Sequence, residues 1–337
     1  MKVAFFSIQS FEATAFKDLN KDVSDHEFTF FTQNLNEETV SLAKGYPAIS
    51  CFANDSLDAQ IIETLAQNGT KLITLRCAGY DKVDVKAIKT HDITLMRVPA
   101  YSPYAIAEYT VGLLIALDRK ITVAWDRVRD GNFDLSGLVG HGINGKTVGI
   151  IGTGKIGGVV ARILKLGFGC EVLAYDIKTD SDLVNIGVRY VSDEKDLLRQ
   201  SDIISLHCPL IAATRHLINA ETLALIKPDA LIVNTGRGGL VDTGALIYAL
   251  MSGKLRGCAL DVYEGEENFF FKPATVKSAA DTEFQRLVAQ PNVIVSGHQA
   301  FLTTGAVNAI VTTTLKNINN FARGEVTENL VPQKYLN

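Results

Sequence analysis

The stretch that decides the fold is VGIIGTGKIG, residues 148–157 of the 337-residue chain. Its first four residues form an apolar strand, its glycines follow the spacing G-x-G-x-x-G, and a helical pattern comes next. Gly152 permits a tight turn, Gly154 lets a pyrophosphate approach the backbone, and Gly157 lets the helix pack on the strand. The free N–H groups and the dipole of that helix then face the phosphates. The stretch therefore predicts a dinucleotide site.

An acidic residue follows this stretch at a suitable distance. Asp176 stands 19 residues after Gly157, at the end of the next predicted strand, residues 171–175. A carboxylate at that place accepts hydrogen bonds from ribose hydroxyls and repels a 2′-phosphate. Lys178, two residues further on, would soften the preference. The pattern nevertheless favours NAD over NADP as the cofactor.

Apolar strands alternate with helical patterns on both sides of the glycine-rich turn, which predicts parallel sheets. The expected strands of the first series are residues 2–7, 27–31, 48–52, 72–75 and 93–96. Those of the second series are residues 148–151, 171–175, 202–207, 230–234, 257–261 and 292–295.

This organisation predicts an α/β protein with two doubly wound parallel-sheet domains. A Rossmann cofactor domain, residues 101–299, is inserted into a flavodoxin-like substrate domain formed by residues 1–100 and 300–337. We expect a last helix, residues 304–321, to fold back onto the first domain. Cofactor and substrate are expected in the cleft between the domains.

Shorter patterns between the early strands predict helices at residues 37–44, 57–68 and 83–89. A longer helix is expected at residues 104–119, after the break between Pro99 and Pro103. It is apolar nearly all round, which predicts burial against another domain or another subunit.

Composition excludes several classes of protein. Hydrophobic residues make up 47% of the chain and charged residues 21%, so a disordered chain is excluded. The net charge is −4 with scattered Lys and Arg, which argues against nucleic acid or anionic lipid as a partner. The N-terminus lacks a signal-peptide pattern, and the apolar stretch 111–117 is too short to span a bilayer.

The five cysteines, at positions 51, 77, 170, 208 and 258, are widely spaced and odd in number. This pattern is typical of small buried side chains in a reducing compartment, and it predicts a cytoplasmic protein. No metal site is expected.

Reduction of a 2-keto acid by hydride requires three further groups. A cation must bind the carboxylate, a donor must polarise the ketone, and an acid must protonate the forming alkoxide. Three residues near the carboxyl ends of predicted strands fit: Arg237 in NTGRGG, Glu266 after the strand 257–261, and His298 in SGHQAF. A guanidinium among glycines can grip a carboxylate, and a histidine beside a carboxylate forms an acid–base pair.

The residue pattern alone leaves alternatives open. It does not select Glu266 over Glu264 or Glu267. His207, at a strand end before a proline, competes with His298 for the acid–base role, whereas three histidines in polar stretches are expected at the surface: His26, His91 and His216.

Along nearly its whole length the chain resembles the D-2-hydroxyacid dehydrogenase family, and most closely the branch of fermentative NAD-dependent D-lactate dehydrogenases. The segments that carry the resemblance, in order, are RCAGYD at 76–81, VPAYSP at 98–103, residues 151–157, LHCPL at 206–210, residues 233–238, residues 260–266 and residues 297–303.

The resemblance implies roles for these residues. Arg237 would bind the substrate carboxylate and carbonyl, and His298, paired with Glu266, would exchange the proton. Backbone N–H groups of Ala78 and Gly79 would hold the carboxylate. The substrate pocket would be lined by Phe52, Tyr101 and Phe301. Beyond the three glycines of the motif, the cofactor would meet Lys155, Ile156, Asp176, His207, Cys208, Pro209, Thr235, Gly236 and Asp261.

The family also implies a homodimer or a higher homo-oligomer, joined through the cofactor domains. Two features bear on the branch. Tyr109 follows Glu108 where many relatives carry histidine, with no expected catalytic consequence. The polar and aromatic insertion at residues 268–287 favours the lactate branch, because phosphoglycerate, glycerate and formate dehydrogenases are typically shorter there.

The function predicted from the sequence is reduction of pyruvate to D-lactate with NADH. The rival within the class is a reductase of bulkier 2-keto acids. The rival from another class is a dinucleotide-sensing corepressor, which would not need Arg237, Glu266 and His298 together.

Overall fold

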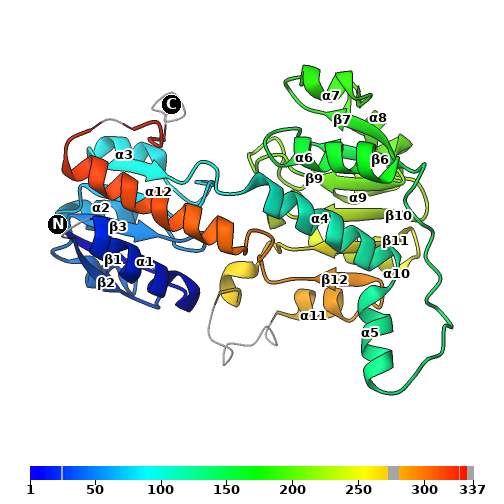
Figure 1. Ribbon diagram of the computed structural model, residues 1–337, viewed down its shortest axis with the longest axis horizontal. Helices are drawn as coiled ribbons and strands as arrows, with labels where there is room; N and C mark the ends of the chain where they lie inside the picture. Colours follow the sequence, from blue (N-terminus) through cyan, green and yellow to red (C-terminus); the bar gives the residue numbers. More distant parts are fainter. Residues whose placement is uncertain (24–25, 272–280, 326, 332–337) are drawn as a thin grey trace. The chain divides into compact units, whose positions relative to one another are not determined.

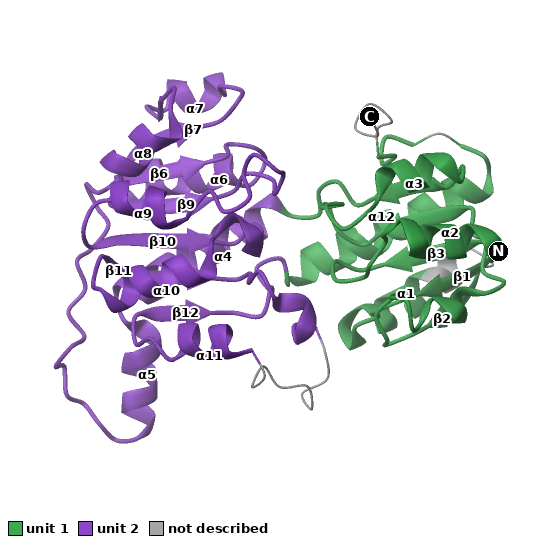
Figure 2. Ribbon diagram, turned by 180° about the vertical axis from the view of Figure 1, so that it is seen from behind, with its two compact units in different colours: residues 1–102, 302–337 green, residues 103–301 purple. Residues whose placement is uncertain are grey.

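The computed structural model describes residues 1–23, 26–271, 281–325 and 327–331 (Figure 1). These residues form two compact units (Figure 2). Unit 1 comprises residues 1–102 and 302–337, and unit 2 comprises residues 103–301. Each unit has its own parallel sheet, which confirms the predicted fold class. None of the described helices is both long enough and apolar enough to cross a membrane.

Unit 1 is built on a five-stranded parallel sheet in the order β2-β1-β3-β4-β5. Its strands are β1 (Lys2–Phe5), β2 (Glu27–Phe30), β3 (Ala48–Cys51), β4 (Leu72–Leu75) and β5 (Thr94–Arg97). Its helical segments are α1 (Ser10–Val23), the 3₁₀ turn η1 (Val40–Ala43), α2 (Ala59–Gln67), α3 (Val85–Thr90) and α12 (Thr304–Ala322).

Alternate side chains of each strand in unit 1 enter different cores, as the pleat of a strand requires. Val3 and Phe5 of β1 pack with α12 residues such as Val311 in one core. Ala4 belongs to the opposite core, where η1, α2 and α3 cover the sheet. Both faces are thus buried, which explains why these strands read as continuous apolar runs.

Unit 2 is built on a seven-stranded parallel sheet in the order β12-β11-β10-β9-β6-β7-β8. Its strands are β6 (Thr147–Ile151), β7 (Glu171–Tyr175), β8 (Arg189–Tyr190), β9 (Ile203–Leu206), β10 (Ala230–Asn234), β11 (Leu255–Leu260) and β12 (Val293–Val295). The strand order reverses direction between β6 and β9, which is the switch point where doubly wound sheets bind dinucleotides.

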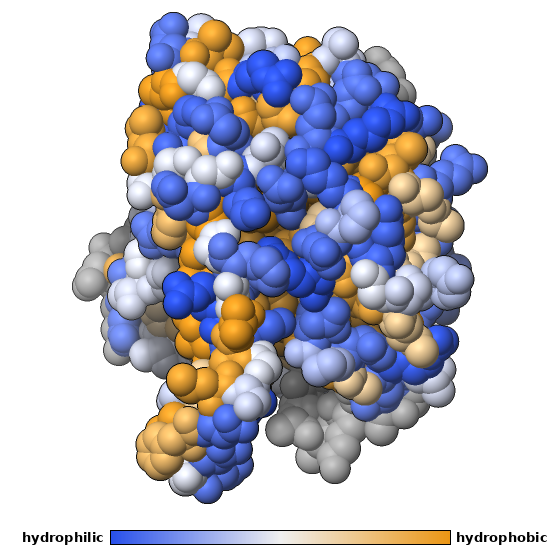
Figure 3. All heavy atoms as spheres, turned by 90° about the vertical axis from the view of Figure 1, so that its right-hand side faces the viewer, coloured by the Kyte–Doolittle hydropathy of each residue, from blue (hydrophilic) through white to orange (hydrophobic). Residues whose placement is uncertain are grey.

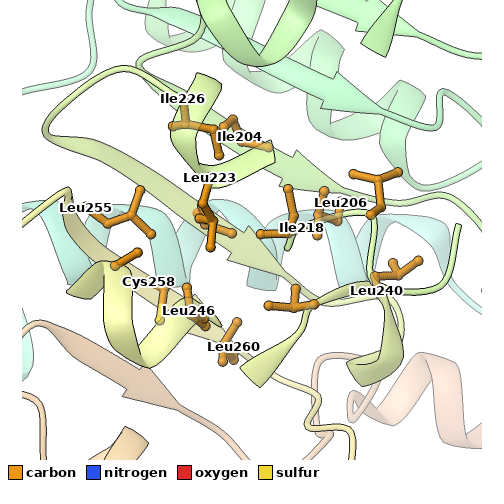
Figure 4. Packing of buried hydrophobic residues seen from close by; sticks show 14 of the residues in the cluster. Ile204, Leu206, Ile218, Leu223, Ile226, Leu240, Leu246, Leu255, Cys258 and Leu260 are labelled. Carbon is orange, nitrogen blue, oxygen red and sulfur yellow. The ribbon is translucent and has the colours of Figure 1, made fainter. Parts of the chain in front are cut away.

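Two helical layers cover this sheet. One face carries α4 (Pro103–Asp118), α6 (Gly157–Arg162) and α7 (Ser181–Asn185). The other face carries α8 (Glu194–Gln200), α9 (Ala220–Leu225), α10 (Thr243–Met251) and α11 (Thr282–Val288), and Figure 4 shows part of the core that they enclose, around Leu206, Leu223 and Leu246.

The long helix α4 buries most of its apolar residues against its own unit. It packs on α6 and on the strands β10, β11 and β12. The helix that follows, α5 (Ile121–Arg129), has no buried residue. The sequence predicted burial of this helix against another domain or another subunit. Its packing within unit 2 explains much of its apolar character.

All eleven predicted strands are confirmed to within two residues at each end. The expected helix at 37–44 is instead the short turn η1. The helix expected after the glycine-rich stretch is α6, which begins at Gly157 and continues as a π-helical turn, η2 (Ile163–Gly167). α1, α5 and the two-residue strand β8 were not predicted. The centre of the insertion at 268–287, residues 272–280, lies outside the described residues.

Candidate active site

The candidate residues of unit 2 lie where its parallel strands end. The glycine-rich turn follows β6, Asp176 follows β7 and His207 follows β9. Arg237, Glu266 and His298 follow β10, β11 and β12, which are neighbours in the sheet. The carboxyl ends of parallel strands share one edge, so the sheet gathers these chemical groups along a single line.

Glu266 and His298 form a direct pair. The Oε1 atom of Glu266 lies 2.7 Å from Nδ1 of His298, and the side chains are only 12% and 18% exposed. The second carboxylate oxygen of Glu266 accepts a hydrogen bond of 3.0 Å from the backbone N–H of Tyr263. Because Nδ1 is occupied by the carboxylate, Nε2 is the ring nitrogen left to exchange a proton.

His298 sits in a turn that is fastened to Asp261. The residue has a left-handed backbone with φ of 55°, and its N–H donates to the Asp261 carbonyl at 2.7 Å. The Asp261 carboxylate accepts from Ser296 Oγ, Gln299 N and Ala300 N at 2.6–2.9 Å. Burial raises the pKa of Asp261, and these hydrogen bonds oppose that shift. The buried carboxylate thus holds a strained turn in one shape.

Arg237 lies in the loop after β10, and hydrogen bonds to Asn234 hold this loop in place. Asn234 accepts from the N–H of Gly236 at 3.0 Å and donates to the Arg237 carbonyl at 2.9 Å. Gly238 lies so close to the backbone of Tyr263 and Glu264 that a Cβ atom would collide with it. The Arg237 loop and the turn that carries Glu266 are therefore in backbone contact.

An aromatic ring that sequence reasoning missed lies beside His298. The Phe271 ring centroid is 5.5 Å from that of the imidazole, with the planes tilted by 47°. Phe271 has φ of 58°, a strained conformation for a residue with a side chain. Phe269 and Phe270, the residues before it, pack instead with Phe284. Because the three phenylalanines are consecutive, no pattern in the sequence indicates that Phe271 is the one beside His298.

The structure also distinguishes the glutamates. Glu264 pairs with Nε2 of His216 at 2.9 Å and with the Arg215 guanidinium. It is thus engaged away from His298, and Glu266 is the glutamate that meets the histidine. His216, expected at the surface, is a half-buried partner of Glu264.

The glycine-rich turn has the shape that a dinucleotide needs. Gly152 has φ of 91°, and a Cβ atom there would strike the backbone at His207 and Cys208. A Cβ atom at Gly154, in contrast, would meet no protein atom within 4 Å. Packing therefore does not require this glycine, and the open space leaves its backbone accessible to a phosphate.

Asp176 lies at this turn. Its Oδ2 accepts from the N–H of Thr153 at 2.6 Å, and its Oδ1 accepts from the N–H of Lys178 at 3.0 Å. A carboxylate offers about four acceptor positions, so some remain for ribose hydroxyls. The residues present therefore fit a dinucleotide with a free 2′-hydroxyl.

The other predicted cofactor residues line the same sheet edge. His207 is bonded to Ser205 at 2.8 Å, and it meets no carboxylate among the described residues. Burial lowers its pKa to about 4, so it is neutral at pH 7. Burial raises the pKa of Cys208 to about 11. Thr235 is bonded to Thr110 of α4 at 2.8 Å. The remaining residues, Lys155, Ile156, Pro209 and Gly236, are half-buried or exposed.

The predicted substrate residues of unit 1 also follow strand ends. Phe52 is buried after β3, with the Arg76 guanidinium 5.4 Å from its ring centroid. Ala78 and Gly79 are half-buried after β4, and Tyr101 is half-buried after β5. Phe301, the last residue of unit 2, is buried. Within the described ranges, no group of three or more His, Cys, Asp or Glu residues is placed to hold a metal ion.

The fold and the glycine-rich turn together define an NAD-binding oxidoreductase. Residues 111–300 match the family described as D-isomer specific 2-hydroxyacid dehydrogenase, NAD binding domain. The chain belongs to this family and is an NAD-dependent D-2-hydroxyacid dehydrogenase.

Particular relatives match nearly the full length. The chain is 50% identical to "2-hydroxyacid dehydrogenase homolog 1" of Schizosaccharomyces pombe, with 96% of each chain covered. It is 42% identical to a pyruvate reductase of Chlamydomonas reinhardtii (TM-score 0.88, 98% of each chain covered). It is 32% identical to the D-lactate dehydrogenase of Aquifex aeolicus solved with NAD and lactic acid (TM-score 0.86, 98% of each chain covered).

Proposed function

We propose that the enzyme reduces pyruvate to D-lactate with NADH, reversibly. The observation that carries this proposal is the pair formed by Glu266 and His298, whose Oε1 and Nδ1 atoms are 2.7 Å apart. The pair lies at the ends of β11 and β12, and Arg237 follows the neighbouring strand β10. Such a set supplies a proton donor and a carboxylate-binding cation on one sheet edge. The similar pyruvate reductase and the similar D-lactate dehydrogenase support pyruvate as the substrate.

In this proposal NADH supplies the hydride when bound, and the residues of the chain supply everything else. His298 donates the proton from Nε2 to the oxygen of the forming alcohol. Glu266, at Nδ1, fixes the tautomer and stabilises the protonated ring. Asp261 keeps the turn of His298 in place through its three hydrogen bonds. In lactate oxidation His298 takes the proton back.

The substrate carboxylate binds the Arg237 guanidinium and the N–H groups of Ala78 and Gly79. No hydrogen-bond partner for these two N–H groups exists among the described residues, so they are available to an anion. Phe52, Tyr101 and Phe301 surround the third substituent of the keto carbon. Three aromatic side chains favour a methyl group there, and a reductase of bulkier 2-keto acids is the alternative.

For the cofactor, Gly152, Gly154 and Gly157 hold the pyrophosphate and Asp176 the ribose. The residues that meet the rest of the cofactor are those named from the resemblance: Lys155, Ile156, His207, Cys208, Pro209, Thr235, Gly236 and Asp261. Residues 101–299 form the cofactor domain, and residues 1–100 with 300–337 the substrate domain. None of the five cysteines is in a disulfide, and this supports a cytoplasmic location.

We also propose a homodimer, and the exposed side chains of unit 2 indicate where it joins. On α5, Ile121, Trp125 and Val128 are 49–60% exposed, and Phe133 and Leu135 beyond it are 74% and 76% exposed. Figure 3 shows such apolar side chains on the projection at the bottom of this face, where Figure 1 has α5. Large apolar residues gathered in this way are typical of a surface that another chain covers.

The function is tested by turnover and product analysis. NADH oxidation with pyruvate should proceed, and chiral chromatography should find D-lactate alone. His298→Ala should lower kcat by roughly 10²- to 10⁴-fold, the usual contribution of general acid–base catalysis, and leave the Kd for NADH unchanged. His91→Asn, at the end of α3, is the matched control. An L product or an active His298→Ala enzyme would overturn the proposal.

A kcat/KM series over pyruvate, 2-ketobutyrate, 2-ketoisocaproate and phenylpyruvate separates the two substrate classes. The values should be highest at pyruvate and fall as the side chain grows. A maximum at 2-ketoisocaproate or phenylpyruvate would keep the proton chemistry and assign the enzyme to the reductases of bulkier acids.

A further inference from the structure

The carbonyl groups of residues 77–79, in the loop after β4, are held by hydrogen-bond donors of unit 1. The Cys77 carbonyl accepts from the N–H of Val98 at 3.3 Å. The Ala78 carbonyl accepts from Nη1 of Arg97 at 2.6 Å, and the Gly79 carbonyl accepts from the Cys77 thiol at 3.2 Å. Three successive carbonyls of one short loop are thus held by protein donors.

The direction of these carbonyls fixes the direction of the N–H groups. No described peptide bond is cis, and in a trans peptide the C=O and the N–H that follows it point in opposite directions. The Ala78 carbonyl shares its peptide plane with the N–H of Gly79. When Arg97 holds that carbonyl, the N–H of Gly79 must point away from Arg97. In the same way, the Cys77 carbonyl accepts from Val98, so the N–H of Ala78 must point away from Val98.

Arg97 is itself held from several sides. Its backbone N–H donates to Asn329 O at 3.0 Å, and its carbonyl accepts from Asn317 Nδ2 at 3.1 Å. Its guanidinium lies 5.1 Å from the ring centroid of Tyr80, the next residue of the loop after Gly79. The guanidinium thus touches the loop at two points, by a hydrogen bond to Ala78 and by a cation–π contact to Tyr80.

We propose that Arg97 is a positioning residue for substrate binding. Its guanidinium orients the peptide between Ala78 and Gly79 so that the N–H of Gly79 is presented to the carboxylate of the 2-keto acid. The positive charge behind this peptide also polarises it, which strengthens the N–H as a donor. This inference rests on the proposed role of Ala78 and Gly79 in binding that carboxylate.

The test measures binding as well as turnover. Arg97→Met keeps the aliphatic stem and removes the hydrogen bond and the charge. A hydrogen bond to a charged group contributes enough that its loss should raise the KM for pyruvate and the Kd for oxamate, a pyruvate mimic, about 10- to 100-fold. The Kd of the enzyme for NADH should stay within about twofold, and kcat should fall much less than KM rises.

Two further variants separate the hydrogen bond from other effects. Arg97→Lys keeps the charge and one donor, and it should recover part of the oxamate affinity. Lys89→Met removes an exposed positive charge of the same unit, in the last turn of α3 and outside the loop 77–80, and should leave oxamate binding unchanged. If Lys89→Met weakens oxamate as much as Arg97→Met, long-range attraction is the cause and the inference is wrong.

The outcomes also distinguish this inference from the proposed function. If the unaltered enzyme neither reduces pyruvate nor binds oxamate, the proposed function fails. If it does both, and Arg97→Met and Arg97→Lys both bind oxamate normally, only the role of Arg97 fails. Should Arg97→Met not fold, a normal oxamate Kd in Arg97→Lys with a lowered melting temperature would overturn the inference, because the damage would then be structural.

Discussion

Nδ1 of His298 lies 2.7 Å from Oε1 of Glu266, and the other oxygen of that carboxylate is held by the backbone N–H of Tyr263. The carboxylate therefore cannot swing away from the imidazole without losing a second hydrogen bond. The pair is a fixed unit, in which the charge of the glutamate acts on the histidine at constant distance. Its effect on proton transfer can be measured through turnover.

Glu266→Gln should lower turnover in both directions. The carboxylate at 2.7 Å from Nδ1 of His298 can only accept a hydrogen bond, whereas the amide of glutamine can also donate, so it no longer fixes the tautomer of the ring. The kcat for pyruvate reduction should fall at least about 10-fold, because general acid–base catalysis depends on the correct form of the imidazole, and the Kd for NADH should stay unchanged. Glu267→Gln, exposed in the same segment, is the control. Equal kcat values in both variants would contradict the pairing.

Asp176→Asn should relax the choice between NADH and NADPH. The change removes the charge that repels a 2′-phosphate and keeps one acceptor oxygen for the N–H groups of Thr153 or Lys178. The ratio of kcat/KM values for the two cofactors should fall at least about 10-fold, since like charges in contact cost several kcal/mol. Equal use of both cofactors by the unaltered enzyme would show that Asp176 does not select.

His207 predicts an acid-dependent loss of stability. Its pKa is lowered from 6.5 to about 4 by burial, so the folded chain resists a proton that the unfolded chain accepts. The contribution of His207 to the free energy of unfolding should be fully present above pH 6.5. It should decrease by about 1–3 kcal/mol as the pH drops from 6.5 toward 4. Denaturant titrations at pH 7 and pH 5 should show a smaller difference between the two pH values for His207→Asn. An equal difference would assign the acid sensitivity to other groups.

Phe271→Leu should affect turnover more than stability. The ring stands 5.5 Å from the imidazole of His298, and aromatic pairs of this kind contribute 0.5–1.5 kcal/mol, so kcat should fall roughly 2- to 10-fold. Phe270→Leu, in the cluster with Phe269 and Phe284, should lower the melting temperature and leave kcat unchanged. If the two variants lose the same activity, the ring of Phe271 has no special effect on His298.

Trp125→Asp should weaken the homodimer. The side chain is 60% exposed on α5, in a helix with no buried residue, so a charge there disturbs no core. Sedimentation velocity should find two chains for the unaltered enzyme and a shift toward one for the variant, with an unchanged circular dichroism spectrum. A dimer of unaltered stability would place the contact elsewhere, and Tyr248→Asp on α10 would be examined next.

The sequence predicted the two sheets, the cofactor turn and the family because each rests on local patterns. Short apolar runs that alternate with helical patterns, and the G-x-G-x-x-G spacing, need no knowledge of distant residues. The choice among Glu264, Glu266 and Glu267 is different, because it depends on which turn approaches β12. Resemblance selected Glu266, and the structure adds the reason: Glu264 is already paired with His216 and Arg215.

Residues that act through a neighbour stayed hidden in the sequence. Arg97 reads as the polar end of a strand, and its contact with Ala78 arises only when β4 and β5 pair in register. Asp261 reads as a cofactor residue, yet its carboxylate accepts three hydrogen bonds from the turn of His298. Such roles follow from long-range contacts, which periodicity does not report.

The way in which the chain closes unit 1 has a consequence for its synthesis. Val3 and Phe5 share their core with Val311 of α12, and Met96 is bridged to Leu330 near the other end of the chain. Unit 2, in contrast, is one continuous segment, residues 103–301. On the ribosome, unit 2 is therefore complete before unit 1. The apolar face of β1 therefore stays uncovered until α12 has been synthesised. A nascent chain stopped near residue 300 would expose that face, which would then bind chaperones or aggregate.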